Sequence, residues 1–344
     1  MLEAGQVTER QVREFRDALL AWYDAQGRAL PWRARPGDPA PDPYAVWLSE
    51  IMLQQTTVAH AGPYWRRFLE AFPTVCELAG ADSDTVMGKW AGLGYYARAR
   101  NLHACAKVVC GERDGTFPVS EAELLTLPGI GPYTAAAIAA ICGGEATNVV
   151  DGNVERVVSR LFAVGTPLPK ARGELRRLAG TLVRNDRVGD YPQALMDLGA
   201  TVCRPRNPGC LLCPVREFCA GHASGEPERF PVKAARKSLP VRYGHAFASH
   251  ADGAVWVERR ADEGLLGGTL GVPTTEWGDS PAPDPDGWTR VGEVRHVFSH
   301  FELVLAVMTG GAPVGEGRWH PVERADELPS LMRKVLRAAN LSGP

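Results

Sequence analysis

One carboxylate lies in a stretch of sequence that is otherwise apolar enough to be packed. Residues 44–57 read Tyr-Ala-Val-Trp-Leu-Ser-Glu-Ile-Met-Leu-Gln-Gln-Thr-Thr, which predicts an amphipathic helix around Glu50. Residues one turn away on such a helix share its face. Here they are Val46, Trp47, Leu53 and Gln54. A carboxylate walled by apolar groups is poorly solvated, so its pKa rises and it can donate a proton near neutral pH. The alternative is a structural Glu at the polar edge of a packed helix, and this stretch alone leaves it open.

A second carboxylate, Asp151, comes where another helix is expected to begin, in Asn148-Val-Val-Asp-Gly-Asn-Val-Glu-Arg156. Asp is among the preferred N-cap residues, so a structural role is the first interpretation. The same carboxylate could instead face a positive charge that develops in a reaction, with Asn153 orienting it. Both interpretations stay open from this segment.

Four cysteines fall within one loop, with the spacing Cys203-x6-Cys210-x2-Cys213-x5-Cys219. Four thiolates suit a [4Fe–4S] cluster. Zinc sites usually pair their ligands as two close doublets, and only one C-x2-C pair is present here. The loop therefore predicts a [4Fe–4S] cluster, with zinc as the alternative. We expect the remaining cysteines to be small core residues without disulfides. They are Cys76, Cys105, Cys110 and Cys142.

A glycine-rich turn, Leu127-Pro-Gly-Ile-Gly-Pro-Tyr-Thr-Ala135, separates two expected helices. Gly129 and Gly131 would let the backbone approach a ligand closely, and the helix after them would present free N–H groups. This arrangement grips a phosphate without reading a base. A plain turn between helices is the alternative interpretation.

Helical periodicity dominates the first 220 residues, which should position these groups on an all-α scaffold. The expected helices cover residues 6–26, 44–57, 59–71, 74–80, 82–91, 95–111, 121–126, 132–142, 151–164, 172–184 and 192–202. A polar, Pro-bounded stretch at 223–240 reads as a linker. Alternating apolar runs then predict an α+β region. Its expected strands are 241–248, 254–259, 291–297 and 301–308, and its expected helix is 328–340.

Composition is that of an ordinary globular chain, with 45% hydrophobic and 23% charged residues among 344. No apolar run approaches a membrane span. The amino terminus lacks the order of a signal peptide, so we expect a cytoplasmic protein. We also expect a monomer. The net charge of −2 does not indicate a nucleic-acid partner by itself, but arginines cluster at 96–101 and 172–187, where phosphate binding or plain solvation would both explain them.

Taken together, the motifs resemble the endonuclease III superfamily of DNA glycosylases and, within it, the adenine DNA glycosylases. The residues that carry the resemblance are Leu30-Pro-Trp-Arg33, Trp47–Thr56, the Gly92–Asn101 segment, Asp151-Gly-Asn-Val154, the four-cysteine loop and Phe298-Ser-His300. The resemblance implies an all-α helix-hairpin-helix glycosylase core with an iron–sulfur loop, followed by a small α+β Nudix-like domain. The implied limits are a six-helix subdomain at about 35–145 with its hairpin at 120–142, an iron–sulfur subdomain formed by the N-terminal helix and 146–222 with its cluster loop at 203–219, and a Nudix-like domain at 241–344.

The resemblance also implies catalytic roles. Glu50 would protonate N7 of an extruded adenine, and Asp151 would stabilise the sugar oxocarbenium ion, as two carboxylates do in glycoside cleavage. Tyr133 stands where bifunctional relatives carry a lysine. Since a tyrosine cannot form a Schiff base with the sugar, the resemblance implies a monofunctional enzyme that leaves an abasic site. Tyr133 and Asn153 would steady Asp151 by hydrogen bonds.

Binding residues follow from the same resemblance, for a double-stranded DNA substrate with adenine opposite 8-oxoguanine or guanine. The implied adenine pocket is formed by Trp32, Arg33, Leu53 and Gln193. Gln55 and Tyr95 would wedge into the duplex, Gly129 and Gly131 would hold a phosphate, and Phe298, Ser299 and His300 would read 8-oxoguanine. Residues 241–344 lack the glutamate cluster of a working Nudix hydrolase, so this domain should bind and not hydrolyse.

Three alternatives remain beside this interpretation. One is a bifunctional glycosylase with lyase activity on oxidised pyrimidines, which Tyr133 and the extra C-terminal region oppose. Another is a non-catalytic iron–sulfur protein that binds DNA, which the presence of both Glu50 and Asp151 opposes. The last is a zinc-containing Nudix hydrolase, opposed by the missing glutamate cluster.

Overall fold

The computed structural model of the protein describes residues 2, 7–34, 38–234, 238–261 and 264–341. The chain divides into two compact units, each built from two separate stretches of sequence. The first comprises Met1–Ile51 and Thr116–Arg236, and the second Met52–Gly115 and Lys237–Pro344. None of the helices in the described part is long and apolar enough to cross a membrane. The domain limits expected from the sequence stay a prediction. Residues 35–37 and 235–237, at the expected start of the six-helix subdomain and in the expected linker, lie outside the described residues.

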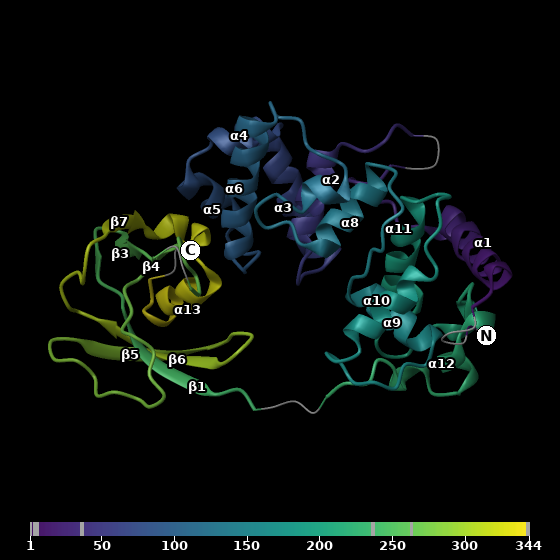
Figure 1. Cartoon of the computed structure of the whole chain (residues 1–344). Helices are drawn as coiled ribbons and strands as arrows, with labels where there is room; N and C mark the ends of the chain where they lie inside the picture. Colours follow the sequence, from purple (N-terminus) through teal and green to yellow (C-terminus); the bar gives the residue numbers. More distant parts are fainter. Residues whose placement is uncertain (1, 3–6, 35–37, 235–237, 262–263, 342–344) are drawn as a thin grey trace. The chain divides into compact units, whose positions relative to one another are not determined.

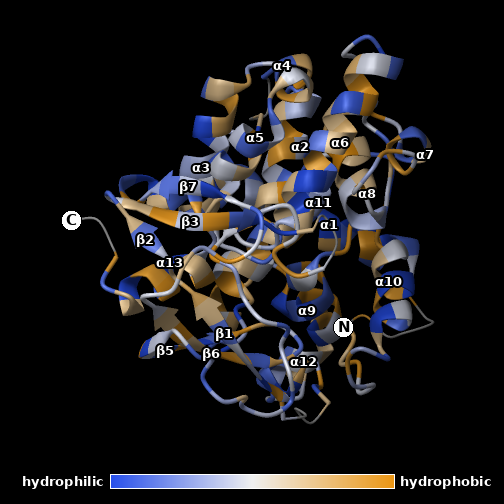
Figure 2. Ribbon diagram, turned by 90° about the vertical axis from the view of Figure 1, so that its left-hand side faces the viewer, coloured by the Kyte–Doolittle hydropathy of each residue, from blue (hydrophilic) through white to orange (hydrophobic). Residues whose placement is uncertain are grey.

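The first unit is helical (Figure 1). Its helices are α1 (Glu9–Gln26), most of α2 (Pro43–Met52), α7 (Glu121–Leu124), α8 (Pro132–Ile141), α9 (Gly152–Leu161), α10 (Arg172–Gly180), α11 (Asp190–Asp197) and α12 (Ala220–Ala223). Helices α1, α9, α10 and α11 share one hydrophobic core. Val12, Phe15 and Leu19, at helical spacing on α1, are at most 1% exposed within it. Figure 2 shows hydrophobic and hydrophilic residues on the same helix in α10, as expected where one face packs and the other meets water.

The hairpin expected at 120–142 is formed by α7, the turn after it and α8. Gly129 has a φ of 74°, in the left-handed region that glycine adopts most easily. Gly131 is the N-cap of α8 and contributes no side-chain acceptor, and Pro132 occupies the first helical position, where a missing N–H costs nothing. The amino end of α8 therefore has no side-chain cap, which the phosphate-binding interpretation requires.

The helix around Glu50 is shorter than expected, because α2 ends at Met52. Nη1 of Arg98 donates to the carbonyl oxygen of Gln54 at 2.7 Å and lies 3.4 Å from that of Met52, so it binds the carbonyls at the end of the helix. Leu53 and Gln54 lie in the turn that follows. The prediction that they share a helical face with Glu50 is therefore wrong.

The second unit begins with four helices close to those expected. They are α3 (Val58–Ala71), α4 (Val75–Gly80), α5 (Ser83–Trp90) and α6 (Ala97–Glu112). Thr57, Thr74 and Asp82 cap the first three, each accepting a hydrogen bond from a backbone N–H in the first turn. Such caps satisfy donors that a helix leaves without partners, so the boundaries were readable from the sequence.

A disulfide joins Cys76 on α4 to Cys110 on α6. The prediction that this pair consists of core residues without a disulfide is wrong. The two helices pack against each other and bring the Cα atoms within 5.1 Å, a separation that a disulfide spans. The sequence separation of 34 residues does not indicate this proximity. Cys105 is a free, buried cysteine, as predicted.

The C-terminal part of the second unit contains two sheets. In the first, β6 lies between β1 and β5 and pairs parallel to β1 and antiparallel to β5. In the second, β3 pairs with β2, β4 and β7. Helix α13 lies between the two sheets (Figure 1), and Leu331, Met332 and Val335 share its core with residues of both. The bounds are β1 (Val241–Phe247), β2 (His250–Ala251), β3 (Ala254–Arg259), β4 (Leu270–Gly271), β5 (Thr289–Val297), β6 (Glu302–Thr309), β7 (Arg318–Pro321) and α13 (Ser330–Ala338).

Part of the segment expected as a linker is packed on the first unit. Leu168 donates its backbone N–H to the carbonyl of Val232, and Arg160 donates Nε to that of Phe230. Phe230 is 7% exposed. Composition marks this segment as polar overall, but the buried side chain of Phe230 packs its first part against the first unit.

Candidate active site

Glu50 is buried on α2, and the residue is 7% exposed. The interpretation of a structural Glu that reaches water is therefore wrong. Burial raises the pKa of Glu50; a hydrogen bond from Tyr133 lowers it and the charge of Asp151 raises it, and the net direction is upward. Val46 and Trp47, expected to wall the carboxyl, are each 1% exposed. A carboxyl in this setting holds its proton at a higher pH than one in water.

Tyr133 connects the hairpin to Glu50. It lies in the first turn of α8, and its hydroxyl donates to Oε2 of Glu50 at 2.7 Å while lying 3.5 Å from Sδ of Met196. Burial and the neighbouring carboxylates hold the pKa of Tyr133 well above its ordinary value. The hydroxyl therefore stays protonated and acts as a donor throughout the working pH range.

Asp151 is the N-cap of α9, as the first interpretation proposed, and it is also part of the site. Its Oδ1 accepts from the backbone N–H of Val154 at 2.7 Å, and its Oδ2 accepts from Nδ2 of Asn153 at 2.8 Å. Asp151 acts electrostatically on both Glu50 and Tyr133. The two carboxylates thus belong to one site, although they are a hundred residues apart in sequence.

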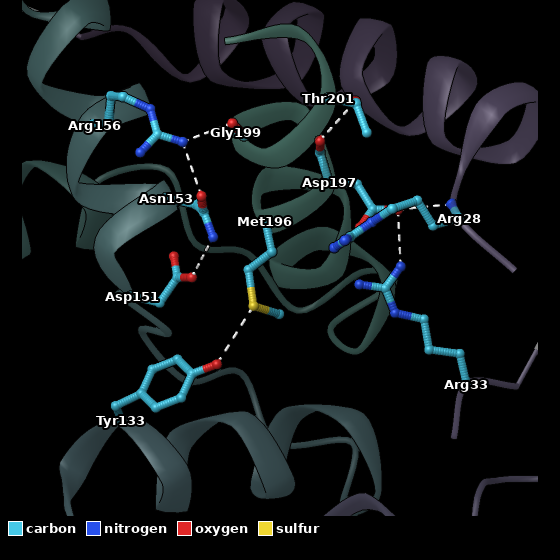
Figure 3. Close-up of polar contacts among 10 residues, drawn as sticks. All are labelled: Arg28, Arg33, Tyr133, Asp151, Asn153, Arg156, Met196, Asp197, Gly199 and Thr201. Atoms are coloured by element: carbon cyan, nitrogen blue, oxygen red, sulfur yellow. Dashed lines mark hydrogen bonds and ion pairs between the residues drawn. The ribbon is translucent and has the colours of Figure 1, made fainter. Parts of the chain in front are cut away.

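Arg156 links this site to the four-cysteine loop, and the sequence did not single it out. Its Nη2 donates to Oδ1 of Asn153 at 2.8 Å and to the carbonyl of Gly199 at 2.6 Å (Figure 3). Its Nε donates to the carbonyl of Cys203 at 2.8 Å. The sequence could have indicated this contact, because Arg156 follows Asn153 by one helical turn in Asp151-Gly-Asn-Val-Glu-Arg156. The Asn153 side chain therefore accepts a hydrogen bond from Arg156 and donates one to Asp151, so Arg156 fixes its orientation.

Residues expected in the adenine pocket are distributed over both units. Trp32 and Gln193, both nearly buried, and Arg33 belong to the first unit. Arg33 donates Nη1 to Oδ2 of Asp197 at 2.8 Å. Leu53 belongs to the second unit, in the turn after α2. Their common role at a base stays a prediction.

The two expected wedge residues share an unusual backbone conformation. Gln55 has a φ of 63° and Tyr95 one of 50°, in the left-handed region that such side chains rarely adopt. Both are exposed, Tyr95 to 54%. Strained residues of this kind concentrate at functional sites. Gln55 lies in a turn and not on the helix of Glu50, so the expected helical spacing between these two residues is wrong.

The segment Phe298-Ser-His300 forms the turn between β5 and β6. The ring of Phe298 packs on those of Trp277 and Phe301 and anchors the turn. Ser299 and His300 are exposed. The hydroxyl oxygens of Tyr95 and Ser299 lie 3.4 Å apart. The second unit thus brings a predicted wedge and a predicted damage-reading residue together.

Comparison with known proteins identifies the family. The HhH-GPD superfamily base excision DNA repair proteins match residues 48–181, and the NUDIX domain matches residues 245–338. An adenine DNA glycosylase of Homo sapiens is 35% identical over 404 residues, which cover 95% of this chain and 74% of that protein. One of Mycolicibacterium smegmatis is 42% identical over 209 residues, covering 61% and 70%. A solved structure of a thermostable thymine-DNA glycosylase superposes with a TM-score of 0.56 at 28% identity, covering 64% of this chain and 100% of that one.

The chain belongs to the adenine DNA glycosylases.

This membership confirms the predicted fold, a helix-hairpin-helix glycosylase with a Nudix-like C-terminal domain, and the predicted class of enzyme, a hydrolytic N-glycosylase that acts on DNA. It excludes a non-catalytic iron–sulfur protein and a zinc-containing Nudix hydrolase. An adenine glycosylase needs an acid for the leaving base and an anion for the sugar cation, and Glu50 and Asp151 have the chemistry for both.

The four cysteines of this glycosylase line one cavity, together with Arg160 and His222. Arg160 is 1% exposed and organises the loop: its Nη1 lies 3.2 Å from Sγ of Cys203 and donates to the carbonyl of Arg204 at 2.7 Å. Across the described residues, no three His, Cys, Asp or Glu side chains converge on a point that would hold a single metal ion. Four thiols around one cavity are a donor set with the chemistry of a [4Fe–4S] site.

Proposed function

We propose that this adenine DNA glycosylase excises adenine paired with 8-oxoguanine, or with guanine, from double-stranded DNA and leaves an abasic site in an intact strand. The observation that carries the proposal is the buried Glu50 carboxyl, hydrogen-bonded by Tyr133 at 2.7 Å within the same unit as Asp151. An acid kept protonated beside a second carboxylate has the composition of a glycoside-cleaving pair.

The reaction assigns one task to each of these groups. Flipping extrudes the adenine, at a cost of a few kcal/mol. Trp32, Arg33 and Gln193 of the first unit and Leu53 of the second are proposed to contact the base. Glu50 then donates its proton to N7. The bond between C1′ and N9 breaks, and its electron pair leaves with the neutral base. The carboxylate of Asp151 faces the resulting oxocarbenium ion, and water adds at C1′ with loss of a proton.

The strand stays intact because the site offers no amine to the sugar. Tyr133 occupies the position at which a lysine would form a Schiff base, and its hydroxyl is engaged with Glu50. Cleavage of the strand without added alkali would contradict this part of the proposal.

DNA binding is proposed to use both units. The amino end of α8, behind Gly129 and Gly131, would hold a backbone phosphate. Gln55 and Tyr95 would wedge into the duplex and offset part of the flipping cost. The turn of Phe298, Ser299 and His300 would read 8-oxoguanine on the other strand. We infer that the enzyme works as a monomer in the cytoplasm.

The cysteine loop is proposed to hold a [4Fe–4S] cluster through Cys203, Cys210, Cys213 and Cys219. The cluster would cross-link a loop of arginines and prolines that has little core of its own. Broad absorbance at about 400 nm in anaerobically purified protein tests this, as expected for thiolate-bound iron. A colourless preparation with one zinc per chain would contradict it.

The decisive test uses purified protein and three duplexes that differ only opposite the adenine: 8-oxoguanine, guanine or thymine. Under single-turnover conditions we expect abasic sites from the first two and none from the third. Absence of abasic sites from the 8-oxoguanine duplex would contradict the proposed function. Release from the thymine duplex at the same rate would show that the second strand is not read.

A further inference from the structure

A buried carboxylate on α11 has no place in the reaction described above. Asp197 is 0% exposed, and its two oxygens accept four hydrogen-bond donors or ion-pair partners. Oδ1 lies 2.7 Å from both Nε and Nη2 of Arg28, while Oδ2 accepts the backbone N–H of Arg28 at 2.7 Å and Nη1 of Arg33 at 2.8 Å. Burial alone would raise the pKa of Asp197, but Arg33 and Arg28 outweigh it and hold the pKa below its ordinary value.

The end of α11 that carries this carboxylate contacts Arg33 through Asp197 and Tyr133 through the adjacent Met196. In Figure 3 the guanidinium groups of Arg28 and Arg33 converge on Asp197 from one side of α11. On the other side the adjacent Met196 points its sulfur at the Tyr133 hydroxyl, 3.5 Å away. The hydroxyl of Thr201, in the π-helix Leu198–Val202, donates to the Asp197 carbonyl at 2.8 Å. Residues 196 and 197 therefore contact both Tyr133, a catalytic residue, and Arg33, a predicted base-binding residue.

Stability alone is a poor reason for such a group. Burying a carboxylate carries a desolvation cost that an apolar residue of similar size would avoid. What the carboxylate provides is orientation: an arginine side chain has several rotatable bonds, and an anion at a fixed point holds its planar fork in one place. Arg33 uses Nη1 for this contact, and across the described residues we find no protein acceptor on its Nε or Nη2. Those donors remain for a substrate.

We propose that Asp197 is a positioning residue for adenine: its carboxylate fixes the guanidinium of Arg33 so that the remaining donors meet the acceptor nitrogens of the extruded base. This inference rests on the proposed function, in which Arg33 lines the base pocket. Arg28, whose side chain is 29% exposed, forms an ion pair with the same carboxylate and compensates its negative charge.

The test is a double-mutant cycle in the full-length holoenzyme, on the duplex with adenine opposite 8-oxoguanine. Asp197→Asn should slow single-turnover excision at saturating enzyme by up to about 100-fold, the effect of misplacing a binding group by about an ångström. Arg33→Gln should slow it at least as much. Because Asp197 acts through Arg33, the double variant should be no slower than Arg33→Gln alone. Affinity for a duplex with non-cleavable 2′-fluoro-2′-deoxyadenosine should change little, since backbone contacts dominate it.

Asp24→Asn is the matched control, since it removes a carboxylate that also holds an arginine, Arg187, but on the surface. It should leave excision unchanged. Excision by Asp197→Asn at the wild-type rate would overturn the inference, as would a double variant whose loss equals the product of the two single losses.

If Asp197→Asn does not fold, Arg33→Lys decides the question, because it keeps a charge for Asp197 but removes the planar fork. We expect slow excision with an unchanged unfolding temperature, and a wild-type rate would overturn the inference.

Wild-type enzyme in the same experiment separates the role of Asp197 from the proposed function. Adenine release by the wild type with no effect in the variants contradicts only the role of Asp197, whereas no release by the wild type contradicts the proposed function.

Discussion

Replacing Glu50 with glutamine isolates the proton that the mechanism requires. Glutamine has nearly the same shape, and its amide oxygen can still accept the hydroxyl of Tyr133, so α2 and α8 keep their contact. What is lost is a carboxylic proton. General acid catalysis contributes roughly 10²–10⁴-fold, which corresponds to about 3–5 kcal/mol of barrier. We therefore expect Glu50→Gln to slow adenine excision by at least about 100-fold.

The same substitution should stabilise the protein at high pH. Burial raises the folded-state pKa of Glu50, so its favourable contribution is full below the unfolded pKa and is lost as pH rises through the folded pKa. Glutamine does not ionise and suffers no such loss. The unfolding temperature of Glu50→Gln should therefore gain on that of the wild type as pH rises from the unfolded to the folded pKa, and the difference should then level off.

Single-turnover excision on the duplex with adenine opposite 8-oxoguanine measures the first effect, and thermal unfolding across pH measures the second. Glu14→Gln is a suitable control, because Glu14 is an exposed residue that pairs with Arg10 on the surface of α1. Residual excision within about tenfold of the wild-type rate would mean that another acid supplies the proton. Destabilisation of Glu50→Gln at high pH would refute the argument from burial.

Three further predictions follow from the geometry. Asp151→Asn should keep the cap of α9, since the asparagine oxygen also accepts from Val154, but it removes the negative charge and the acceptor of Asn153. Excision should therefore fall by at least about 100-fold, with a smaller loss of stability. Equal loss of stability and activity would contradict this. Gly199→Ala should displace Asn153, whose Cβ would lie 2.7 Å from the new methyl group, and slow excision by up to about 100-fold, whereas Gly173→Ala, which enters open space, should have no effect. Dithiothreitol or Cys76→Ser should lower the unfolding free energy by about 3–4 kcal/mol for a loop of 34 residues, and an unchanged unfolding temperature would argue against the disulfide.

Local patterns in the sequence predicted most of the elements, because caps, periodicity and turn residues act within a few positions. The alternation in 301–308 predicted the central strand β6 to within one residue at each end. The short strands β2, β4 and β7 were missed, since two to four residues are too few to show a period. The end of α2 was also missed, because Arg98, more than forty residues later, binds its last carbonyls.

Within the site, the sequence predicted which residues have suitable chemistry better than it predicted which residues contact one another. Glu50 was readable as an acid among apolar neighbours, although Leu53 was assigned to its helical face wrongly. Tyr133 and Asn153 were named through the family resemblance. Asp197 was not, because a carboxylate at the end of a helix does not reveal which arginines it will meet. Pairings of this kind depend on tertiary packing and leave no periodic signal.

The most direct test of the account is the pH dependence of adenine excision by the wild-type enzyme under single-turnover conditions. Since burial raises the pKa of Glu50, the rate should stay high through mildly acidic pH and fall as rising pH removes that proton, and Glu50→Gln should be slow without this falling limb. A wild-type rate that increases with pH, or a falling limb that persists in Glu50→Gln, would contradict the claim that Glu50 is the proton donor.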